Sequence, residues 1–277
     1  MGTSRALAAA WWGPTMISVL TVNYHSAEDL AQLVESLRAH RSAEPIELIV
    51  TNNSPSQHLS FPGNDLAVTV LDADNPGFAA GINRAFRASK GEFIMLANPD
   101  LQVTAHALDS AVALLKSHPD VGIVLPRLFY ADGRVQPSVR RFYTWLVVLY
   151  ARSPFRALGW RPEFFRRYLC EELTSLPANS EPVDVDWGLG GAMFLRRADC
   201  ESGGIFDERF FLYFEDVDLC LRTWQSGRRV VLAPGIECIH AHRRSSGNPL
   251  SAAGWHHFRS MMRFVAKHGG WPQRPGR

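Results

Sequence analysis

The sequence is poor in cysteine and lacks long apolar runs. Four cysteines occur in 277 residues, without a C-x-x-C pair, at Cys170, Cys200, Cys220 and Cys238. This spacing argues against a zinc knuckle, a redox pair or a disulfide scaffold, and it favours a reducing cytoplasm. No apolar run approaches the ~20 residues that cross a bilayer. The apolar stretch within residues 1–15 is also too short for a signal peptide. We expect a cytoplasmic protein whose residues 1–15 form a loose extension.

An excess of charge of either sign is also missing, since the formal net charge is +2. Such a balance gives no reason to expect a nucleic acid partner, although arginine pairs such as Arg166-Arg167 occur. With 46% hydrophobic and 20% charged residues, the chain has the composition of an ordinary globular protein. Its length suits one large core, or a core with a small subdomain.

Strand-like and helix-like segments alternate in the first half. Runs typical of strands lie at 16–22, 46–50, 67–71 and 92–97. Apolar residues at helical spacing lie at 30–37, 79–89 and 105–116. A strand, a helix and a strand make a βαβ unit. We therefore predict an α/β fold with a mostly parallel sheet and helices on both faces.

The second half is less regular. Apolar strands at 121–125 and 128–130 lead into Ala131-Asp132-Gly133, a hairpin signal. Further strands are expected at 183–185, 192–195, 230–232 and 236–239, with a short helix at 216–224. Gly188, Gly190 and Gly191 interrupt them where backbone would approach something closely. Because no linker is evident, we predict one domain at 16–270 with halves 16–130 and 131–270, then a tail at 271–277.

Asn98, Pro99 and Asp100 follow the strand at 92–97. Proline cannot donate to a sheet ladder, so Pro99 marks where the chain leaves the sheet. Ligands of open α/β sheets bind at the carboxyl ends of the strands, which makes Asp100 a candidate ligand for a metal or substrate. The alternative is that Asp100 is an ordinary turn residue.

Three more segments carry candidate groups. The glycine-rich stretch 75–83 would open a helix whose free N–H groups attract an anion, although simple capping is an alternative. Glu215, Asp216 and Asp218 follow an aromatic run, and either of the first two suits a helix cap. His240 and His242 end a strand, and two imidazoles near so many acids suit a divalent ion.

Together, the stretches NPGFAAGINRAFRASKGEFIMLANPDLQV, GGIFDERFFLYFEDVDLCLR and CIHAHRRSS resemble glycosyltransferase family 2, and most closely its bacterial rhamnosyltransferase-like members. The resemblance extends from about Met16 to about Gly270. It implies the GT-A fold, in which 16–130 binds a nucleotide sugar and 131–270 forms a smaller mixed lobe for the acceptor. It also implies inverting transfer in bacterial surface polysaccharide synthesis.

The resemblance also implies roles for individual residues. Asp100 and His240 look like ligands of a Mg²⁺ or Mn²⁺ that holds the donor diphosphate. Asp216 looks like the catalytic base, with Glu215 beside it. Asn52 stands where relatives carry an Asp that binds the nucleobase. The implied nucleotide-sugar site comprises Val22, Asn23, Tyr24, Asn52, Asn75, Gly77, Gly81, Asn83 and Asn98, and the implied acceptor site comprises Trp187, Gly191 and Asp218. For Asp218, orientation of the helix or its neighbours is the alternative role.

The chemistry agrees with these roles. Negative charge develops on the departing diphosphate, where a divalent ion stabilises it, and the attacking hydroxyl must lose a proton to a carboxylate. At a helix start, Asp216 would be ionised at neutral pH. The favoured donor is dTDP-rhamnose by resemblance, with a UDP-hexose as the alternative. A nucleotide-sugar pyrophosphorylase lacks support because no basic G-x-G loop lies near the N-terminus, and a non-catalytic relative would not need both Asp100 and Asp216.

Residues 142–168 combine apolar and aromatic residues with flanking arginines. This composition suits the headgroup region of a membrane, with tryptophan and arginine at the surface. Burial in the second lobe or a homodimer contact is the alternative. If the membrane hypothesis holds, the protein lies on the inner face of the cytoplasmic membrane, where a lipid-linked acceptor is presented.

Overall fold

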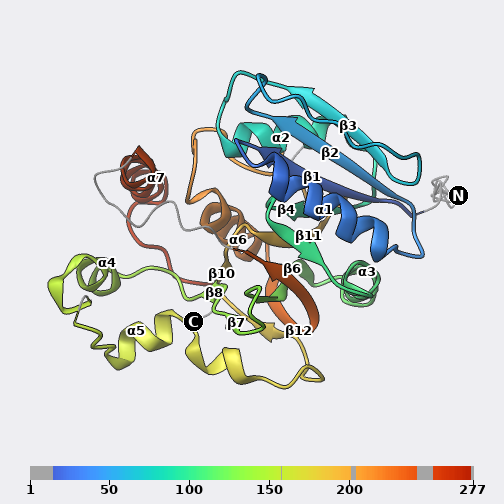
Figure 1. The fold of residues 1–277 in the computed structure, drawn as a ribbon. Coiled ribbons are helices and arrows are strands. Elements are labelled where there is room, and N and C mark those ends of the chain that lie inside the picture. The colour runs from blue at the N-terminus through green and yellow to red at the C-terminus, as the bar shows by residue number, and fades with distance from the viewer. Residues whose placement is uncertain (1–14, 157, 201–203, 242–251, 276–277) are drawn as a thin grey trace, which may run out of the picture.

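The computed structural model describes residues 15–156, 158–200, 204–241 and 252–275 (Figure 1). The predicted extension at 1–15 therefore lies almost wholly outside the described residues, and so does His242. The strands of the first half are β1 (Ile17–Asn23), β2 (Ile46–Asn52), β3 (Ala67–Asp72), β4 (Phe93–Ala97) and β5 (Leu101–Val103). Its helices are α1 (Ala27–Ala39), α2 (Phe78–Ala88) and α3 (Ala107–Ser117). These bounds confirm the predicted alternation.

In the second half the strands are β6 (Val121–Phe129), β7 (Val135–Gln136), β8 (Val139–Arg140), β9 (Val183–Asp184), β10 (Trp187–Gly188), β11 (Ala192–Arg196) and β12 (Arg229–His240). The helices are α4 (Trp145–Arg152), α5 (Glu163–Tyr168), α6 (Glu215–Gln225) and α7 (Ala252–His268). The predicted strands 230–232 and 236–239 form one strand, β12, with a shift of register between Ala233 and Glu237.

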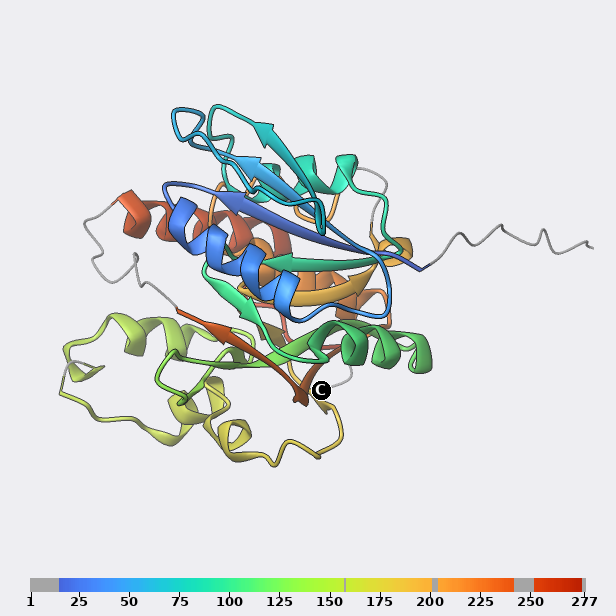
Figure 2. The same cartoon turned by 45° about the vertical axis from the view of Figure 1, so that its right-hand side comes forward.

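One sheet runs through both halves of the chain, in the order β3-β2-β1-β4-β11-β6-β12-β5. Strands β1 to β4 are parallel neighbours, whereas β11 is antiparallel to both β4 and β6. The predicted hairpin at 131–133 is confirmed, since β6 and β7 pair antiparallel around it. Figure 2 shows how the sheet twists between its two layers of helices.

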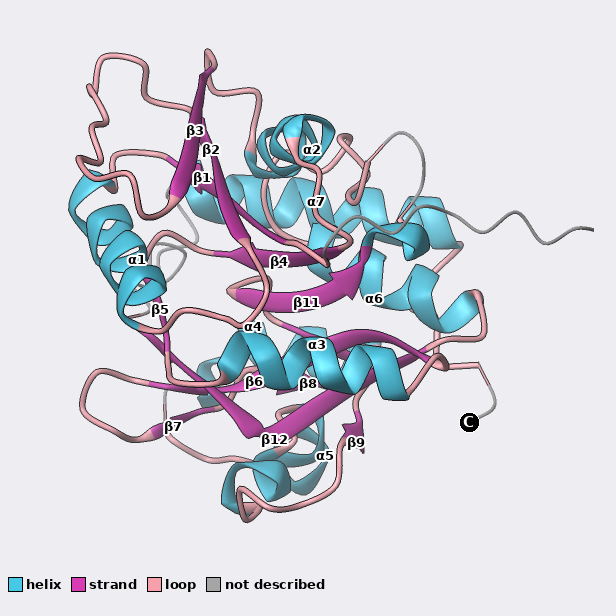
Figure 3. Ribbon diagram, turned by 90° about the vertical axis from the view of Figure 1, so that its right-hand side faces the viewer, coloured by secondary structure: helices cyan, strands magenta, loops and turns pink. Residues whose placement is uncertain are grey.

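Alternation along the strands supplies a core on each face of the sheet. In β1, Ile17 and Val19 pack with α1 and α3, whereas Leu20 and Val22 pack with α2 and α6. Such an arrangement buries both faces of a parallel sheet. Figure 3, viewed from the right of Figure 1, shows α1 and α3 covering one face and α2, α6 and α7 the other.

Parallel pairing aligns the carboxyl ends of β1, β2, β3 and β4 along one edge of the sheet. The antiparallel strand β11 begins at that edge, because Ala192 pairs with Ala97. The last residue of β12, His240, pairs with Leu101 just beyond β4. Polar segments from both halves of the sequence therefore meet at one edge.

Candidate active site

A series of hydrogen-bonded side chains, two amides and a carboxylate, crosses the carboxyl ends of the first three strands. Asn23, Asn52 and Asp72 are direct partners in the β1, β2 and β3 registers. Nδ2 of Asn23 donates to Oδ1 of Asn52 at 2.8 Å, and Nδ2 of Asn52 donates to Oδ1 of Asp72 at 2.8 Å. Asn23 and Asn52 are buried, and Asp72 is exposed. Sequence analysis missed Asp72, although a carboxylate that ends a parallel strand beside Asn52 was a usable signal.

Other residues that were predicted to bind the nucleotide lie near this hydrogen-bonded series. The Tyr24 side chain is exposed, whereas Val22 in β1 is buried. Gln57, which sequence analysis also missed, accepts a hydrogen bond of 3.2 Å from Nδ2 of Asn23. A planar base with both donors and acceptors on its edge would find complementary groups here.

The loop before α2 needs glycine at one position. Gly77 has φ of +100°, and a Cβ there would lie 2.6 Å from the carbonyl oxygen of Phe211. The next residue, Phe78, donates its backbone N–H to that same oxygen at 2.7 Å. This N–H group is therefore engaged with the protein, and the loop is joined to the segment before α6.

Two predicted nucleotide residues have structural roles instead. Gly81 lies in α2 against β1, where a Cβ would come within 2.8 Å of the Val22 side chain. Asn83 is buried, donates to the carbonyl oxygen of Phe206 at 2.8 Å and accepts from the N–H groups of Ile205 and Phe206. Gly81 therefore allows α2 to approach β1, and the Asn83 amide is used to hold the segment at Ile205 and Phe206.

Asp100, Asn98 and His240 converge where β4 and β12 end. Oδ1 of Asp100 and Nδ2 of Asn98 each lie 3.2 Å from Nε2 of His240. On its other side, Nδ1 of His240 lies 2.9 Å from Oε1 of Gln136. Gln136 Oε1 can only accept, so it favours the proton on Nδ1, and Nε2 of the neutral ring can then accept from the Asn98 amide or bind a cation. Sequence analysis missed Gln136.

This set of groups fits a divalent ion. The Nε2 lone pair and the Asp100 carboxylate are both electron donors, and a cation removes the repulsion between them. Within the described residues, no group of three or more His, Cys, Asp or Glu side chains is arranged to hold a metal ion by protein ligands alone. A site with two protein ligands suits Mg²⁺ or Mn²⁺ that takes its remaining ligands from substrate phosphates and water.

Gly190 and Gly191 lie between these groups and Asp216. The N–H of Gly190 donates to Oδ2 of Asp216 at 3.1 Å. A Cβ on Gly191 would lie 3.1 Å from the His240 ring, and the carbonyl oxygen of Gly191 accepts from the Asn98 N–H at 3.0 Å. The dipeptide thus contacts Asp216, the candidate base, on one side and His240, a candidate metal ligand, on the other. This agrees with the prediction that backbone comes close to other groups at these glycines.

Burial perturbs the acids at the start of α6. Desolvation raises the pKa of Asp216 to about 6, against the lowering effect of hydrogen bonds from the Val217 and Gly190 N–H groups. Burial, and then the charge of Asp216, raise the pKa of Glu215 well above its ordinary value. The expectation that the helix terminus alone keeps Asp216 ionised was therefore incomplete, because desolvation outweighs it. A base with a pKa near 6 is well matched to neutral pH.

The turn before these acids has a strained backbone. Tyr213 and Phe214 have φ of +68° and +69°, in the left-handed region that non-glycine residues rarely adopt. Phe214 is held by rings from several directions: Tyr143 stacks on it at 5.3 Å, and Phe264 of α7 packs at 5.5 Å. The aromatic run in the sequence thus fixes the conformation that presents Glu215 and Asp216.

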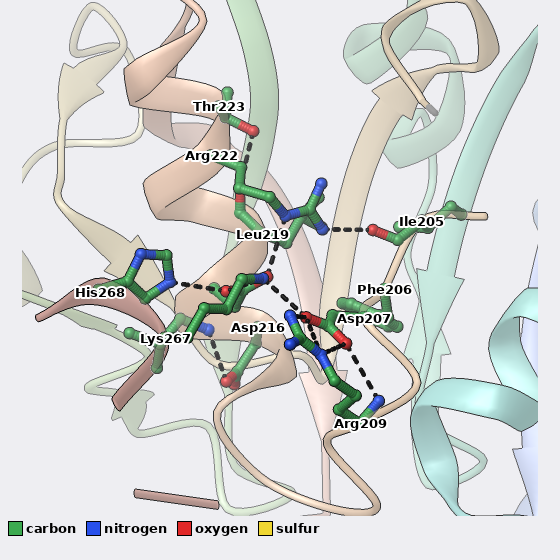
Figure 4. Close-up of polar contacts among 12 residues, drawn as sticks. Ile205, Phe206, Asp207, Arg209, Asp216, Leu219, Arg222, Thr223, Lys267 and His268 are labelled. Atoms are coloured by element: carbon green, nitrogen blue, oxygen red, sulfur yellow. Dashed lines mark hydrogen bonds and ion pairs between the residues drawn. The ribbon is translucent and has the colours of Figure 1, made fainter. Parts of the chain in front are cut away.

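Asp218 was implied for the acceptor site, with orientation of the helix as the alternative role, and its placement favours the alternative. It is fully buried, and Arg222, Lys267 and His268 surround its carboxylate. Figure 4 shows these three basic side chains close to one another. Oδ2 lies 2.9 Å from Nε of Arg222, and Oδ1 lies 2.7 Å from Nζ of Lys267 and 2.8 Å from Nε2 of His268. With no exposed surface, Asp218 instead joins α6 to α7.

Trp187 is also buried, and its Nε1 donates to the Arg141 carbonyl oxygen at 2.8 Å. The predicted acceptor contact therefore does not fit Trp187 either. Tyr143, which sequence analysis did not single out, stacks on Trp187 at 5.6 Å and lies close enough to Asp216 for that charge to contribute to its raised pKa. Burial is the main cause of that raised pKa. Tyr143 is thus the aromatic side chain that links Trp187 to the acids of α6.

Sequence comparison finds relatives along nearly the whole chain. Residues 18–172 match the family model described as glycosyl transferase family 2. The chain is 27% identical to the N-acetylglucosaminyl-diphospho-decaprenol L-rhamnosyltransferase of Mycobacterium tuberculosis, over 94% of this chain and 87% of that protein. It is 24% identical to the rhamnosyltransferase WbbL of Escherichia coli K12, over 91% of this chain and 93% of that protein.

Solved structures share the fold. The mannosyltransferase PcManGT of Pyrobaculum calidifontis, in complex with GDP-Man and Mn²⁺, aligns with a TM-score of 0.57 at 18% identity, over 95% of this chain and 67% of that one. GalNAc-T7 with UDP, GalNAc and Mn²⁺ aligns with a TM-score of 0.61 at 14% identity, over 91% of this chain and 48% of that one. At such identities the likeness establishes the fold alone.

Proposed function

Because the chain belongs to glycosyl transferase family 2 and has the GT-A fold, we propose that it moves rhamnose from dTDP-rhamnose, with inversion, to a hydroxyl of a lipid-linked glycan. The predicted family and fold class are confirmed, and the chain is a rhamnosyltransferase-like glycosyltransferase. The donor, the acceptor and the metal dependence are the proposed parts.

One observation carries the mechanism. The Gly190-Gly191 dipeptide has Asp216 on one side and the His240 and Asp100 pair on the other. A sugar whose diphosphate lies at Asp100 would have its anomeric carbon over this dipeptide. Asp216 would then face the carbon from the side opposite the leaving group, which is the geometry that a single in-line displacement needs.

The donor nucleotide is proposed to bind across the strand ends. Thymine and uracil both carry an N–H group between two carbonyls, and the exposed Asp72 carboxylate can accept from that N–H. The buried Asn52 amide orients Asp72 by donating to its Oδ1. Asn75, Gly77 and Tyr24 border the same edge. These contacts do not engage position 5 of the base, so a UDP-hexose remains the second candidate donor.

Asp100 and His240, with Asn98 alongside, would hold Mg²⁺ or Mn²⁺. When bound, the ion would neutralise the charge that develops on the departing diphosphate. Gln136 orients His240 by accepting from Nδ1, so that Nε2 faces Asp100. Two of the solved structures with this fold contain Mn²⁺, which supports the choice of a divalent ion.

Asp216 is proposed to accept the proton of the attacking hydroxyl. Its raised pKa of about 6 keeps it largely ionised at neutral pH while increasing its basicity. Burial, and then the charge of Asp216, raise the pKa of the neighbouring Glu215 well above its ordinary value and so favour its neutral form. A neutral carboxyl adds no second negative charge beside Asp216.

A ligand screen followed by a transfer assay tests the proposal. Thermal unfolding is followed with dTDP-rhamnose, UDP-sugars and GDP-mannose in the presence of Mn²⁺. A ligand at 100 times its Kd stabilises by about 2.7 kcal/mol. A rise in unfolding temperature with thymidine nucleotides alone supports dTDP-rhamnose as the donor. A rise with uridine nucleotides alone would contradict it and favour a UDP-hexose. Transfer is then measured to a polyprenyl-diphosphate N-acetylglucosamine, the class of acceptor named in the mycobacterial relative.

A further inference from the structure

The segment from α4 to Trp160 exposes an unusual number of large apolar side chains. Trp145, Leu146, Leu149, Phe155, Leu158 and Trp160 are each more than half exposed, and Leu158 reaches 78%. Val147, Val148 and Tyr150 of the same helix are buried in the core. One face of α4 thus packs inside, as the burial alternative predicted, and the other face is exposed.

A second stripe of exposed apolar side chains lies on α7. Trp255, Phe258 and Met262 are spaced at i, i+3 and i+7, which places them on one face of the helix. The opposite face contributes Met261 and Phe264 to the core. Burial of the inner face leaves the outer apolar face without a described partner in the chain. We call these two exposed stripes together the apolar face.

The two stripes belong to neighbouring elements. Nη2 of Arg152 in α4 lies 3.4 Å from Sδ of Met261 in α7. Trp145 meets Trp271, just after α7, edge to face at 5.6 Å. Figures 1 and 2 both show α4 and α7 at the same end of the molecule, toward which β1 runs.

The apolar face is also joined to the catalytic turn. Trp271 packs on Phe214 at 6.3 Å and on Tyr143 at 5.2 Å, and Phe214 directly precedes Glu215 and Asp216. Aromatic rings therefore link the apolar face to the turn that presents Asp216.

The charge within the two stripes has one sign. Residues 145–160 contain two arginines and no acid, and the exposed face of α7 carries Arg259 with no acid anywhere in the helix. The acids nearby in sequence, such as Glu171, are paired with arginines such as Arg161. Arg152 and Arg259 are exposed within the face itself. A second copy of this chain would bring the same positive surface against it, and like charges disfavour such a self-complementary contact. An anionic surface with an apolar interior is complementary to both features.

We propose that the apolar face docks on an anionic lipid bilayer. Tryptophan, leucine and phenylalanine would enter the boundary between headgroups and acyl chains, and the arginines would contact the anionic headgroups. Among the described residues, no helix has the length and apolarity to traverse a bilayer. The chain therefore lies on the surface, with the apolar face toward the lipid. This inference draws on the proposed function only for the lipid-linked acceptor.

The test is co-sedimentation with vesicles of phosphatidylcholine, with and without phosphatidylglycerol, at low and high salt. The wild-type chain should bind only the phosphatidylglycerol vesicles and should be released by salt. Leu146→Ser/Leu149→Ser and Trp255→Ser/Phe258→Ser should each lower the bound fraction at least about tenfold, and Arg259→Glu should lower it as well. Val70→Ser, an exposed apolar residue of β3, is the matched control and should bind like wild type.

Thermal unfolding and the nucleotide-induced shift are measured on every variant, so that a folding defect or loss of donor binding is seen separately. A wild-type chain that stays in solution with anionic vesicles at low salt overturns the proposal. So does equal binding to neutral vesicles. A dimer in light scattering that the same double variants convert to monomer would assign the apolar face to a second copy, and would also overturn it.

Discussion

Lys267, in the last turn of α7, places its Nζ 2.7 Å from Oδ1 of the fully buried Asp218 in α6. The same oxygen lies 2.8 Å from Nε2 of His268, and Lys267 also reaches Asp207. The final helix is thus tied electrostatically to the helix that begins with Glu215 and Asp216. Because Asp218 follows Asp216 by two residues, the ion pairs of Asp218 help to hold the start of α6, and with it Asp216, in position.

Asp218→Asn should therefore destabilise the protein strongly. Removing the carboxylate leaves Lys267 and Arg222 with reduced compensation, and breaking a buried pair typically costs about 3–5 kcal/mol. Denaturant unfolding measures this. Lys116→Ala, which breaks the exposed pair with Glu44, is the control and should cost less than about 1 kcal/mol. Similar losses for both variants would contradict a structural role for Asp218.

Asp216→Asn should retain donor binding and lose transfer by roughly 10²–10⁴-fold, the usual scale for a general base. The donor Kd and the transfer rate are measured separately, because only the second needs the carboxylate. Asp132→Asn, at the exposed hairpin tip, is the control. Wild-type transfer by Asp216→Asn would move the base to Glu215.

Activity should depend on the ionisation of Asp216. Its pKa is raised to about 6, so kcat/KM should fall as pH drops through about 6, by about tenfold for each further unit. The effect on stability has the opposite sign. The folded state binds this proton more tightly than the unfolded state, because the pKa of Asp216 is raised from 3.8 to about 6. The contribution of Asp216 to the free energy of unfolding therefore falls as pH rises from 3.8 to about 6. A flat kcat/KM profile across pH 6 would be inconsistent with Asp216 as the base.

Asp100→Ala should weaken donor binding in Mn²⁺ and have little effect in EDTA. The reason is that the carboxylate acts through the ion that would bridge protein and diphosphate. Calorimetric titration of the donor, with and without metal, gives the two Kd values without any turnover. Equal Kd values for wild type and variant in Mn²⁺ would return Asp100 to the role of a turn residue.

Asp72→Ala should weaken binding of thymidine and uridine diphosphates roughly tenfold, because a charged acceptor of the base N–H is lost. Binding of the free diphosphate should not change, which makes pyrophosphate the control ligand. If both ligands weaken alike, Asp72 supports the sheet edge and does not contact the base.

Much of this arrangement could be predicted from sequence, because it depends on local patterns. Strand ends at Asn23, Asn52 and Asn98 were visible where apolar alternation stops at a polar residue. The roles of Gly81 and Asn83 were not visible, because each is decided by a neighbour distant in sequence, Val22 and Phe206 respectively. For Asp218 an orienting role was predicted, but its distant partner Lys267 was not. Gln136 was missed for the same reason, since its partner His240 lies 104 residues away.

Helix α7 could not be predicted because its signal is mixed. Its residues include three histidines, a glycine and apolar side chains on both faces. Only packing of Phe264 and Met261 against the core selects one face for burial. Tertiary packing, more than helix propensity, therefore determines that these residues form a helix and which face is buried.

The left-handed turn at Tyr213 and Phe214 has a consequence for engineering the enzyme. Glycine would relieve backbone strain of about 1–3 kcal/mol, but at Phe214 it would also remove a buried aromatic side chain, which costs about 3–5 kcal/mol. Selection for heat resistance and selection for turnover should therefore both retain Phe214, because the same ring stabilises the core and holds Glu215 and Asp216 in place. Thermostable variants that remain active should carry their substitutions elsewhere, and Phe214 should be among the last to vary in any library screened for both properties.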